Sequence, residues 1–573
     1  MVRRIDAVVE TDVLVIGGGG AACRAVVAAH DAGAHTLLVL KGELGASGAT
    51  VAPGRGVAWQ AADDCSSPED SPDVHLANIL DAGLGMADPR LARIVAYETP
   101  ARTDEMDRWG LRFAPDPTGK KRHFTAYSCF GDQPRAHSIM NSGHGHAGDI
   151  VLVLREQMAR RDIRVDENVF ITDLVTQEGV CRGALALGPD GQVILYRAGA
   201  VVLGVGGARQ LYPSAGGRAI DTTGDGYAMA LRAGAQITNM EYGQHMLHTF
   251  GGRGMQVVGS HWALYPTLRD ANGVDILAEH LPPGTTARQA FHERTLHAPF
   301  SCRDASGWLD ISIVTALREG RGTPEGGITV DFSDVDLSTF TPSRPMHLPR
   351  DESLPTVLPE EPLQVHSTAH AVNGGVRIDE QGASTLPGLY AAGEVAAGPH
   401  GADRLGGGMV TNCQVFGLRA GRYAAEFALG AGAGELADVA LEPALARLGS
   451  YGRGERRPDE VLARLQAATG RSLVVVRNQA GLERLLADIV LLRGDELPGV
   501  SVDGPNALRR AIEVDNSLIT AHLMATAALS RTESRGSHYR EDFPTRDDAH
   551  WDVNIVFRES GGRLEQWTER SDR

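Results

Sequence analysis

The sequence predicts an α/β protein in which one doubly wound domain is interrupted by an inserted α+β domain and followed by a helical domain. Three observations predict it: a βαβ pattern opens the chain, glycine-rich α/β sequence returns after residue 360, and apolar positions recur at spacings of three and four beyond residue 435. We therefore place the first domain at residues 1–243 and 361–432, the inserted domain at 244–360, and the helical domain at 433–573.

The first element is the strand–turn–helix–strand unit DVLVIGGGGAACRAVVAAHDAGAHTLLVLK. Its first strand is the apolar run Val13–Ile16, and an alanine-rich helix separates this run from a second one. Gly17, Gly19 and Ala22 match the G-x-G-x-x-A pattern at the turn. Glycines there let the backbone approach a pyrophosphate, which the N-terminus of the helix attracts. The unit therefore predicts a Rossmann-like domain that binds a dinucleotide.

Further glycine clusters distinguish between the candidate dinucleotides. The acidic residue that would bind the ribose of NAD is missing at the end of the second strand, where Lys41 stands instead. Two more clusters follow in VVLGVGGARQLYP and GLYAAGEVAAGPHGADRLGGG. An NAD enzyme seldom needs three separate glycine loops, whereas the ribityl chain and isoalloxazine of FAD run past several. The pattern therefore favours FAD.

Composition excludes several functions. The chain has 55 lysines and arginines against 72 aspartates and glutamates, a formal net charge of −17, which argues against nucleic-acid binding. An anionic substrate would need a local island of positive charge, so arginines and histidines in glycine-rich loops are candidates. The six cysteines form no C-x-x-C pair, so no metal site or iron–sulfur cluster is expected in this chain. No run of 18 apolar residues and no signal-like segment occurs, which predicts a cytoplasmic protein without a transmembrane segment.

Four segments carry a resemblance to a known family. TGDGYAMALRAGA, GLYAAGEVAAG, GADRLGGG and RTESRGSHYREDFPTRDDAHW occur in matching order and resemble the flavoprotein subunit of succinate dehydrogenase and fumarate reductase. The same superfamily includes L-aspartate oxidase and the α subunit of adenylylsulfate reductase. The resemblance covers nearly the whole chain. It implies an FAD-binding domain, an inserted capping domain, and hydride exchange between flavin N5 and a small anionic metabolite such as a carboxylate.

The resemblance also implies roles for individual residues. Arg404 matches the arginine that grips a substrate carboxylate, with Asp403 where the family has asparagine, and His370 matches a histidine that helps to bind this group. His248 and His261 are the candidates for moving a proton, because imidazole titrates near neutral pH. The residues expected to bind the cofactor are Gly17, Gly19, Gly20, Ala22, Lys41, Ser47, Gly48, Gly206, Gly207, Asp225, Glu394 (the family's ribityl-binding glutamate), Gly408, Met409 and Val410.

The chain departs from the family pattern at three places. GASGATVAPGRG lacks the histidine that tethers FAD in many members, so non-covalent FAD is expected. The histidine of the family's F-H-P-T-G falls near Met246, between His245 and His248. The capping-domain arginine that delivers a proton in fumarate reductases falls near His261 and Trp262. Simple fumarate reduction is therefore not the expected reaction.

Two weaker assignments rest on single segments. HSIMNSGHGHAGDIV is similar to a stretch of adenylylsulfate reductase, which makes His144 and His146 candidates for the substrate side. CRDASGWLDISIVTALREGRG resembles a capping-domain stretch of the family, and we expect its Arg303 and Asp304 to form a structural pair.

Three functions stay open at this point. The first is a dehydrogenase or reductase of a small anionic metabolite. The second is an oxidase like L-aspartate oxidase, in which oxygen reoxidises the flavin, or a flavoprotein like that of adenylylsulfate reductase, which an iron–sulfur protein accompanies. The third is a flavin-binding subunit that has lost its chemistry and serves assembly. An iron–sulfur or ferredoxin partner would be the electron acceptor in several of these cases.

Overall fold

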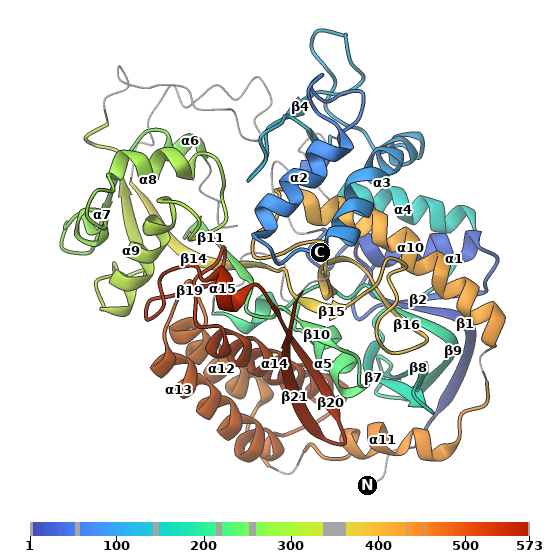
Figure 1. Cartoon of the computed structure of the whole chain (residues 1–573). Helices are drawn as coiled ribbons and strands as arrows, with labels where there is room; N and C mark the ends of the chain where they lie inside the picture. Colours follow the sequence, from blue (N-terminus) through green and yellow to red (C-terminus); the bar gives the residue numbers. More distant parts are fainter. Residues whose placement is uncertain are drawn as a thin grey trace.

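The computed structural model describes residues 4–51, 58–140, 148–213, 221–250, 259–335, 362–432, 434–452 and 454–570. A mostly parallel sheet forms the centre of the first domain, with the order β6–β2–β1–β9–β8–β7 and with β16 paired to β9 (Figure 1). These strands are β1 (Ala7–Ile16), β2 (Thr36–Val39), β6 (Arg164–Asp166), β7 (Phe170–Gln177), β8 (Val180–Leu187), β9 (Val193–Leu203) and β16 (Leu389–Ala391). The predicted α/β class is confirmed.

Burial on both faces explains the apolar run in β1. Strands β2 and β9 flank β1 in parallel register, and the run from Val13 to Val15 is fully buried. Central parallel strands that are covered on both faces read as continuous apolar stretches. The run therefore fixes β1 at the centre of the sheet, and the glycine turn that follows lies at the carboxyl edge.

Two helices run in the same direction against this sheet, α1 (Gly20–Asp31) and α10 (Gly408–Ala431). A Cβ at Gly417 of α10 would lie only 2.8 Å from the carbonyl oxygen of Ala21, and one at Gly421 would overlap that of Ala25. The helices therefore touch backbone to backbone, and their N-termini point to the same edge. The other helices of this domain are α2 (Pro72–Gly83), α3 (Pro89–Arg108), α4 (Gly148–Arg160) and α5 (Asp225–Arg232), beside a small sheet of β3 (Ala58–Gln60), β4 (Thr125–Ala126) and β5 (Ala136–Ser138).

The inserted capping domain has its own antiparallel sheet, of order β11–β14–β13–β12, and its own core around Trp262, Leu309 and Val330. In Figure 1 this domain (green) lies to the upper left of the central sheet, and most of the helical domain (brown and red) lies to the lower left. Strand β14, the last of this sheet in chain order, begins just after the predicted boundary at residue 360. The chain then returns to the first domain. The elements are β11 (Gly243–Thr249), α6 (Gly259–Trp262), β12 (Thr267–Arg269), α7 (Ile276–His280), α8 (Ala287–Arg294), α9 (Gly307–Arg318), β13 (Ile328–Asp331) and β14 (Leu363–Val372).

The C-terminal domain is helical up to residue 530 and then departs from the prediction. Its end is an antiparallel hairpin whose strands β20 and β21 meet at Gly561 and Gly562, both with positive φ. The hairpin joins a sheet of order β17–β15–β10–β20–β21, and its Gly-Gly pair favours a tight turn. The elements are α11 (Glu442–Leu448), α12 (Pro458–Ser472), β18 (Val476–Arg477), α13 (Gln479–Leu491), α14 (Pro505–Ser530), β19 (Tyr539–Arg540), α15 (Asp548–Trp551), β20 (Asn554–Ser560) and β21 (Arg563–Glu569), with β10 (Ile237–Thr238), β15 (Gly375–Arg377) and β17 (Ala396–Ala397). Among the helices of the described residues, none has both the length and the apolar character needed to cross a bilayer.

Lys41 connects the first domain to α14. Its Nζ donates to Thr223 Oγ1 at 2.8 Å and to Asp225 Oδ2 at 2.9 Å, and it lies 3.3 Å from Glu513 Oε1. Burial opposes the charge of Lys41, but the two carboxylates outweigh burial and raise its pKa. Lys41 therefore links Asp225, at the N-terminus of α5, to Glu513 of the helical domain.

We expect Lys41→Met to lower the free energy of unfolding by on the order of 3 kcal/mol, because it leaves two mostly buried carboxylates with one cation fewer. Urea unfolding followed by circular dichroism measures the loss. Lys120→Met, at an exposed lysine, is the matched control and should change little. Equal stability of the two variants would contradict a linking role for Lys41.

Candidate active site

The turn between β1 and α1 leaves open space beside a helix N-terminus. Gly17 has a φ of +118°, and a Cβ there would overlap the carbonyl oxygen of Gly204. Gly19 is the N-cap of α1, and the nearest described atom to a Cβ at Gly19 is Thr50 Oγ1, at 3.3 Å. The Gly20 N–H donates to the same hydroxyl at 3.2 Å. This arrangement suits a phosphate group held by backbone N–H groups.

The N-terminus of α10 lies on the other side of the same edge. Gly407 caps the helix, and Gly408, Met409 and Val410 form its first turn, as expected for backbone groups that approach a ligand. His400, which the sequence reasoning missed, lies against this turn, with its Cε1 3.5 Å from a Cβ built at Gly408. Burial lowers the pKa of His400 well below its usual range, so the ring is neutral.

Glu394 presents a carboxyl group between these two helix ends. It is 8% exposed, its Oε1 accepts from the Val372 N–H at 3.1 Å, and Gly207 packs directly against it. Burial raises the pKa of Glu394, while Arg209 and the Val372 N–H oppose that rise. A buried carboxyl at this place can accept hydrogen bonds from the hydroxyl groups of a ribityl chain.

Arg404 is a buried cation without a carboxylate partner among the described residues. It is 6% exposed; its Nη2 donates to Gln244 Oε1 at 3.1 Å and lies 3.4 Å from His370 Nε2, and its Nη1 donates to the Leu405 carbonyl at 3.2 Å. Its Nε has no hydrogen-bond partner in the same part of the chain. Burial lowers the pKa of Arg404, and the charge of Glu394 partly offsets that effect. An uncompensated guanidinium in a chain of net charge −17 is a site for an anion.

Histidines line the paired strands β11 and β14 beside Arg404. Burial, followed by the charges of Arg209 and Arg404, lowers the pKa of His370 well below its usual range, which agrees with an Nε2 that accepts from Arg404. His248 Nδ1 lies 2.7 Å from the hydroxyl of Thr368, two residues before His370 on the same strand. Burial lowers the pKa of His248 as well. The structure therefore brings Arg404, His370 and His248 together.

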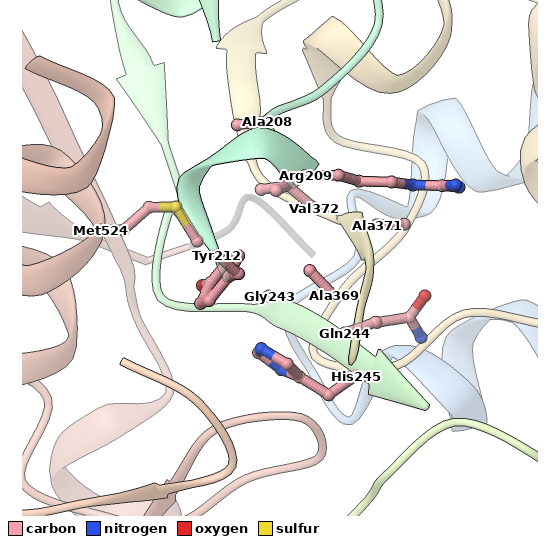
Figure 2. Close-up of a pocket in the computed structure, with 10 residues that line it drawn as sticks. All are labelled: Ala208, Arg209, Tyr212, Gly243, Gln244, His245, Ala369, Ala371, Val372 and Met524. Carbon is pink, nitrogen blue, oxygen red and sulfur yellow. The ribbon is translucent and has the colours of Figure 1, made fainter. Parts of the chain in front are cut away.

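Arg209 and Gln244 are further residues of this site that the sequence reasoning did not select. Figure 2 shows both side chains extending to the right of the view, whereas Tyr212, His245 and Met524 lie on the left. The Nε of Arg209 and the Nε2 of Gln244 are buried atoms without a hydrogen-bond partner in the described part of the chain. Arg209 acts on the pKa of Glu394 and of His370, so its charge faces the same space. The sequence signal that could have identified Arg209 is its position two residues after the glycine pair of GVGGAR.

The residues at this edge fit an FAD molecule. The open glycine turn suits the pyrophosphate, Glu394 suits the ribityl chain, and buried polar atoms without partners in the described residues lie where an isoalloxazine would need donors and acceptors. These atoms are Arg209 Nε, Gln244 Nε2, His400 Nε2, Arg404 Nε and Asn412 Oδ1. Buried polar atoms without a hydrogen-bond partner are rare in native proteins. A bound ligand at this edge would supply partners for these five atoms.

The other predicted residues have contacts of their own. Ser47 Oγ donates to the Glu43 carbonyl at 3.3 Å, and the Gly48 N–H donates to Asp221 at 3.3 Å. His261 belongs to α6, next to the buried Trp262 in the core of the capping domain. A direct role of Ser47, Gly48, Gly206, Lys41 or Asp225 at the cofactor, and of His261 in proton transfer, stays a prediction.

One of the two weaker assignments can be placed. Arg303 and Asp304 do not pair with each other: Arg303 pairs with Asp81 at 2.7 Å and Asp304 with His297 at 3.2 Å. The sequence alone could not predict these partners, because the side chains of neighbouring residues on a turn point in different directions. His144, His146, Arg253 and residues 52–56 of the GASGATVAPGRG segment lie outside the described residues.

Known proteins are similar to this chain in sequence and in fold. The family model described as FAD binding domain matches residues 12–410, and the model described as fumarate reductase flavoprotein C-term matches residues 462–567. A fumarate reductase (CoM/CoB) subunit of Methanothermobacter marburgensis is 33% identical, over 96% of this chain and 97% of that protein. L-aspartate oxidase of Caulobacter vibrioides is 30% identical, over 93% and 94%. The structure of Mycobacterium smegmatis Sdh1 in complex with UQ1 has a TM-score of 0.81 and 26% identity, over 98% of this chain and 94% of that one.

These matches cover the glycine turn and the Arg404 loop, whose geometry fits FAD and an anion. They also cover the C-terminal domain. The predicted cofactor, enzyme class and arrangement of an FAD-binding, capping and helical domain are confirmed. The chain belongs to the fumarate reductase and succinate dehydrogenase family of flavoproteins and is an FAD-dependent oxidoreductase.

Proposed function

We propose that this protein is a dehydrogenase or reductase of a small anionic metabolite that carries a carboxylate, with hydride exchange at flavin N5. The observation that carries the proposal is Arg404, a buried guanidinium that contacts Gln244, His370 and a carbonyl but no acid among the described residues. A substrate carboxylate would supply the missing negative charge and accept two parallel hydrogen bonds from the guanidinium.

Bound FAD supplies the hydride chemistry, and the chain supplies binding, orientation and exclusion of water. Arg404 and His370 would fix the carboxylate beside the flavin, whose edge would lie near the N-terminus of α10. A neutral His370 donates or accepts one hydrogen bond and adds no charge to the site. Burial by the capping domain strengthens the attraction between Arg404 and the anion, since water no longer screens it.

His248 is our candidate for moving the proton that accompanies the hydride. Its Nδ1 is engaged with Thr368 Oγ1 at 2.7 Å, which orients the ring and leaves Nε2 for the substrate. Because burial lowers the pKa of His248, the ring is unprotonated at neutral pH and can accept a proton. This assignment suits the oxidation direction.

The test is anaerobic mixing of the FAD-loaded protein with succinate, fumarate, aspartate, or sulfite with AMP, followed through flavin absorbance. We expect one anion to bleach the oxidised flavin, or to reoxidise flavin that has been photoreduced. Steady release of hydrogen peroxide under air would favour the oxidase that L-aspartate oxidase exemplifies, and slow release would favour a partner protein as electron acceptor. Failure of every anion in both directions would support a subunit without chemistry.

We expect Arg209→Gln to weaken binding of oxalate, a dianion, by about tenfold more than binding of acetate. Arg209 supplies a second positive charge to the site, and a hydrogen bond to a charged group is worth about 1.5–3 kcal/mol. Dissociation constants from flavin absorbance changes measure the effect. Arg422→Gln, on the exposed face of α10, is the matched control. If Arg209→Gln weakened the binding of oxalate and of acetate equally, Arg209 would not be a residue that favours dianions over monoanions.

A further inference from the structure

Asp403, the residue before Arg404, is a buried acid with little to stabilise a negative charge. It is 1% exposed, its Oδ2 accepts one hydrogen bond, from Ser301 Oγ at 2.6 Å, and its Oδ1 has no partner in the described residues. The Asp403 N–H donates to the Ala82 carbonyl at 3.2 Å, so the backbone is fixed as well. A buried carboxylate usually accepts several hydrogen bonds or pairs with a cation.

The charged groups around Asp403 do not supply that pairing. From the segment before α9, Arg303 is engaged with Asp81 at 2.7 Å, and His297 is engaged with Asp304, which itself adds a like charge. On its own loop, the guanidinium of Arg404 is turned to Gln244 and His370. From the C-terminal segment, the nearby Glu533 is already paired with Arg531 and Arg535. Burial therefore dominates and raises the pKa of Asp403 from 3.8 to about 7.

Ser301 belongs to the segment Ala298–Cys302, through which the capping domain meets the rest of the molecule. The N–H of Phe300 donates to the His245 carbonyl at 2.8 Å, and that of Cys302 donates to the Gly536 carbonyl at 2.8 Å. The Ser301–Asp403 hydrogen bond joins this segment to the loop that carries Arg404. The contact therefore couples the position of the capping domain to the position of the guanidinium.

We propose that Asp403 is a positioning residue, which as a neutral carboxylic acid docks the segment Ala298–Cys302 onto the Arg404 loop and which weakens anion binding when it ionises. The anion-binding part of this inference rests on the proposed function; the protonation part does not. An ionised Asp403 needs more hydrogen-bond donors, or water, at its contact with Ser301. The loop that carries Arg404 must move to bring them to the carboxylate. Asn, the residue of the family at this place, keeps the shape without the ionisation.

The sign of the pH dependence follows from the raised pKa. Between about pH 4 and pH 7 the folded protein keeps a proton on Asp403 that the unfolded chain has lost, so stability falls as the pH rises through this window and levels off above it. Asp403→Asn removes this fall. Anion binding that requires the neutral form weakens above pH 7 by about tenfold per pH unit.

The experiment compares the FAD-loaded wild type, Asp403→Asn and Ser301→Ala between pH 5 and pH 9. Oxalate is the probe, because it stays doubly ionised across this range, and its dissociation constant is read from flavin absorbance. We expect a bend near pH 7 in the wild type, a flat profile at wild-type strength in Asp403→Asn, and a bend at higher pH in Ser301→Ala, since the serine hydroxyl stabilises the ionised form. Asp503→Asn, at an exposed acid, should keep the wild-type bend.

A second readout separates this inference from the proposed function. The thermal midpoint of each variant against pH, and the infrared carbonyl stretch of a protonated carboxyl group, need no substrate. A weaker infrared band in Asp403→Asn, together with a midpoint that falls less towards pH 7 than that of the wild type, would support the inference even if oxalate did not bind. A bend that persists in Asp403→Asn, or midpoints that run parallel to the wild type, would overturn it.

Discussion

Arg404→Ala should keep its FAD and lose turnover by at least about thirtyfold. We expect the Arg404 guanidinium to contact the substrate, and the glycine turn, Glu394 and the N-terminus of α10 to hold the cofactor. Removing one partner of a buried charged hydrogen bond costs about 2–5 kcal/mol, which corresponds to roughly 30-fold to several thousandfold in kcat/KM. Flavin absorbance of the purified variant and anaerobic reduction by the identified substrate measure the two quantities.

Arg404→Lys is the matched variant for this prediction. It keeps the charge but loses the planar fork, so we expect intermediate activity and a raised KM. The thermal midpoint of both variants should stay close to the wild type, because the partners of Arg404 are Gln244, His370 and a carbonyl rather than a buried acid. Colourless Arg404→Ala protein would show that the residue holds the flavin itself and would contradict an anion-binding role.

Gly19→Val should fold and yet fail to bind FAD. The backbone at Gly19 is extended, with φ −81° and ψ 178°, which valine adopts readily, and a Cβ there meets only the flexible Thr50 hydroxyl among the described atoms within 4 Å. The side chain instead fills the space beside the N-terminus of α1, where the pyrophosphate is expected. We therefore expect a colourless protein with a normal circular dichroism spectrum and loss of at least about a hundredfold in FAD affinity.

Gly17→Val provides the contrast. Its positive φ and the overlap of a Cβ with the Gly204 carbonyl force the backbone to move, so this variant should lose fold stability as well as cofactor. Gly430→Val, near the end of α10 with no described atom within 4 Å of its Cβ, should bind FAD normally. A yellow Gly19→Val protein would contradict the assignment of the turn to the pyrophosphate.

Local patterns were enough for the features that lie within one stretch of chain. The apolar run of β1, the glycine turn and the alanine-rich helix specify a βαβ unit, because strand periodicity, turn geometry and helix packing each act over a few residues. The hairpin of β20 and β21 was missed although its Gly-Gly turn is just as local.

The sequence by itself determined the FAD-binding fold, the family and the loop that holds Arg404. Only the tertiary structure decided which distant groups act together: Lys41 pairs with Glu513 across 472 positions, Arg404 meets Gln244 across 160, and Asp403 meets Ser301 across 102. Such pairs leave no periodic trace in the sequence, because each depends on the packing of whole domains. The state of charge of Asp403 and of His370 depends in turn on burial, which exists only once those domains have closed over them.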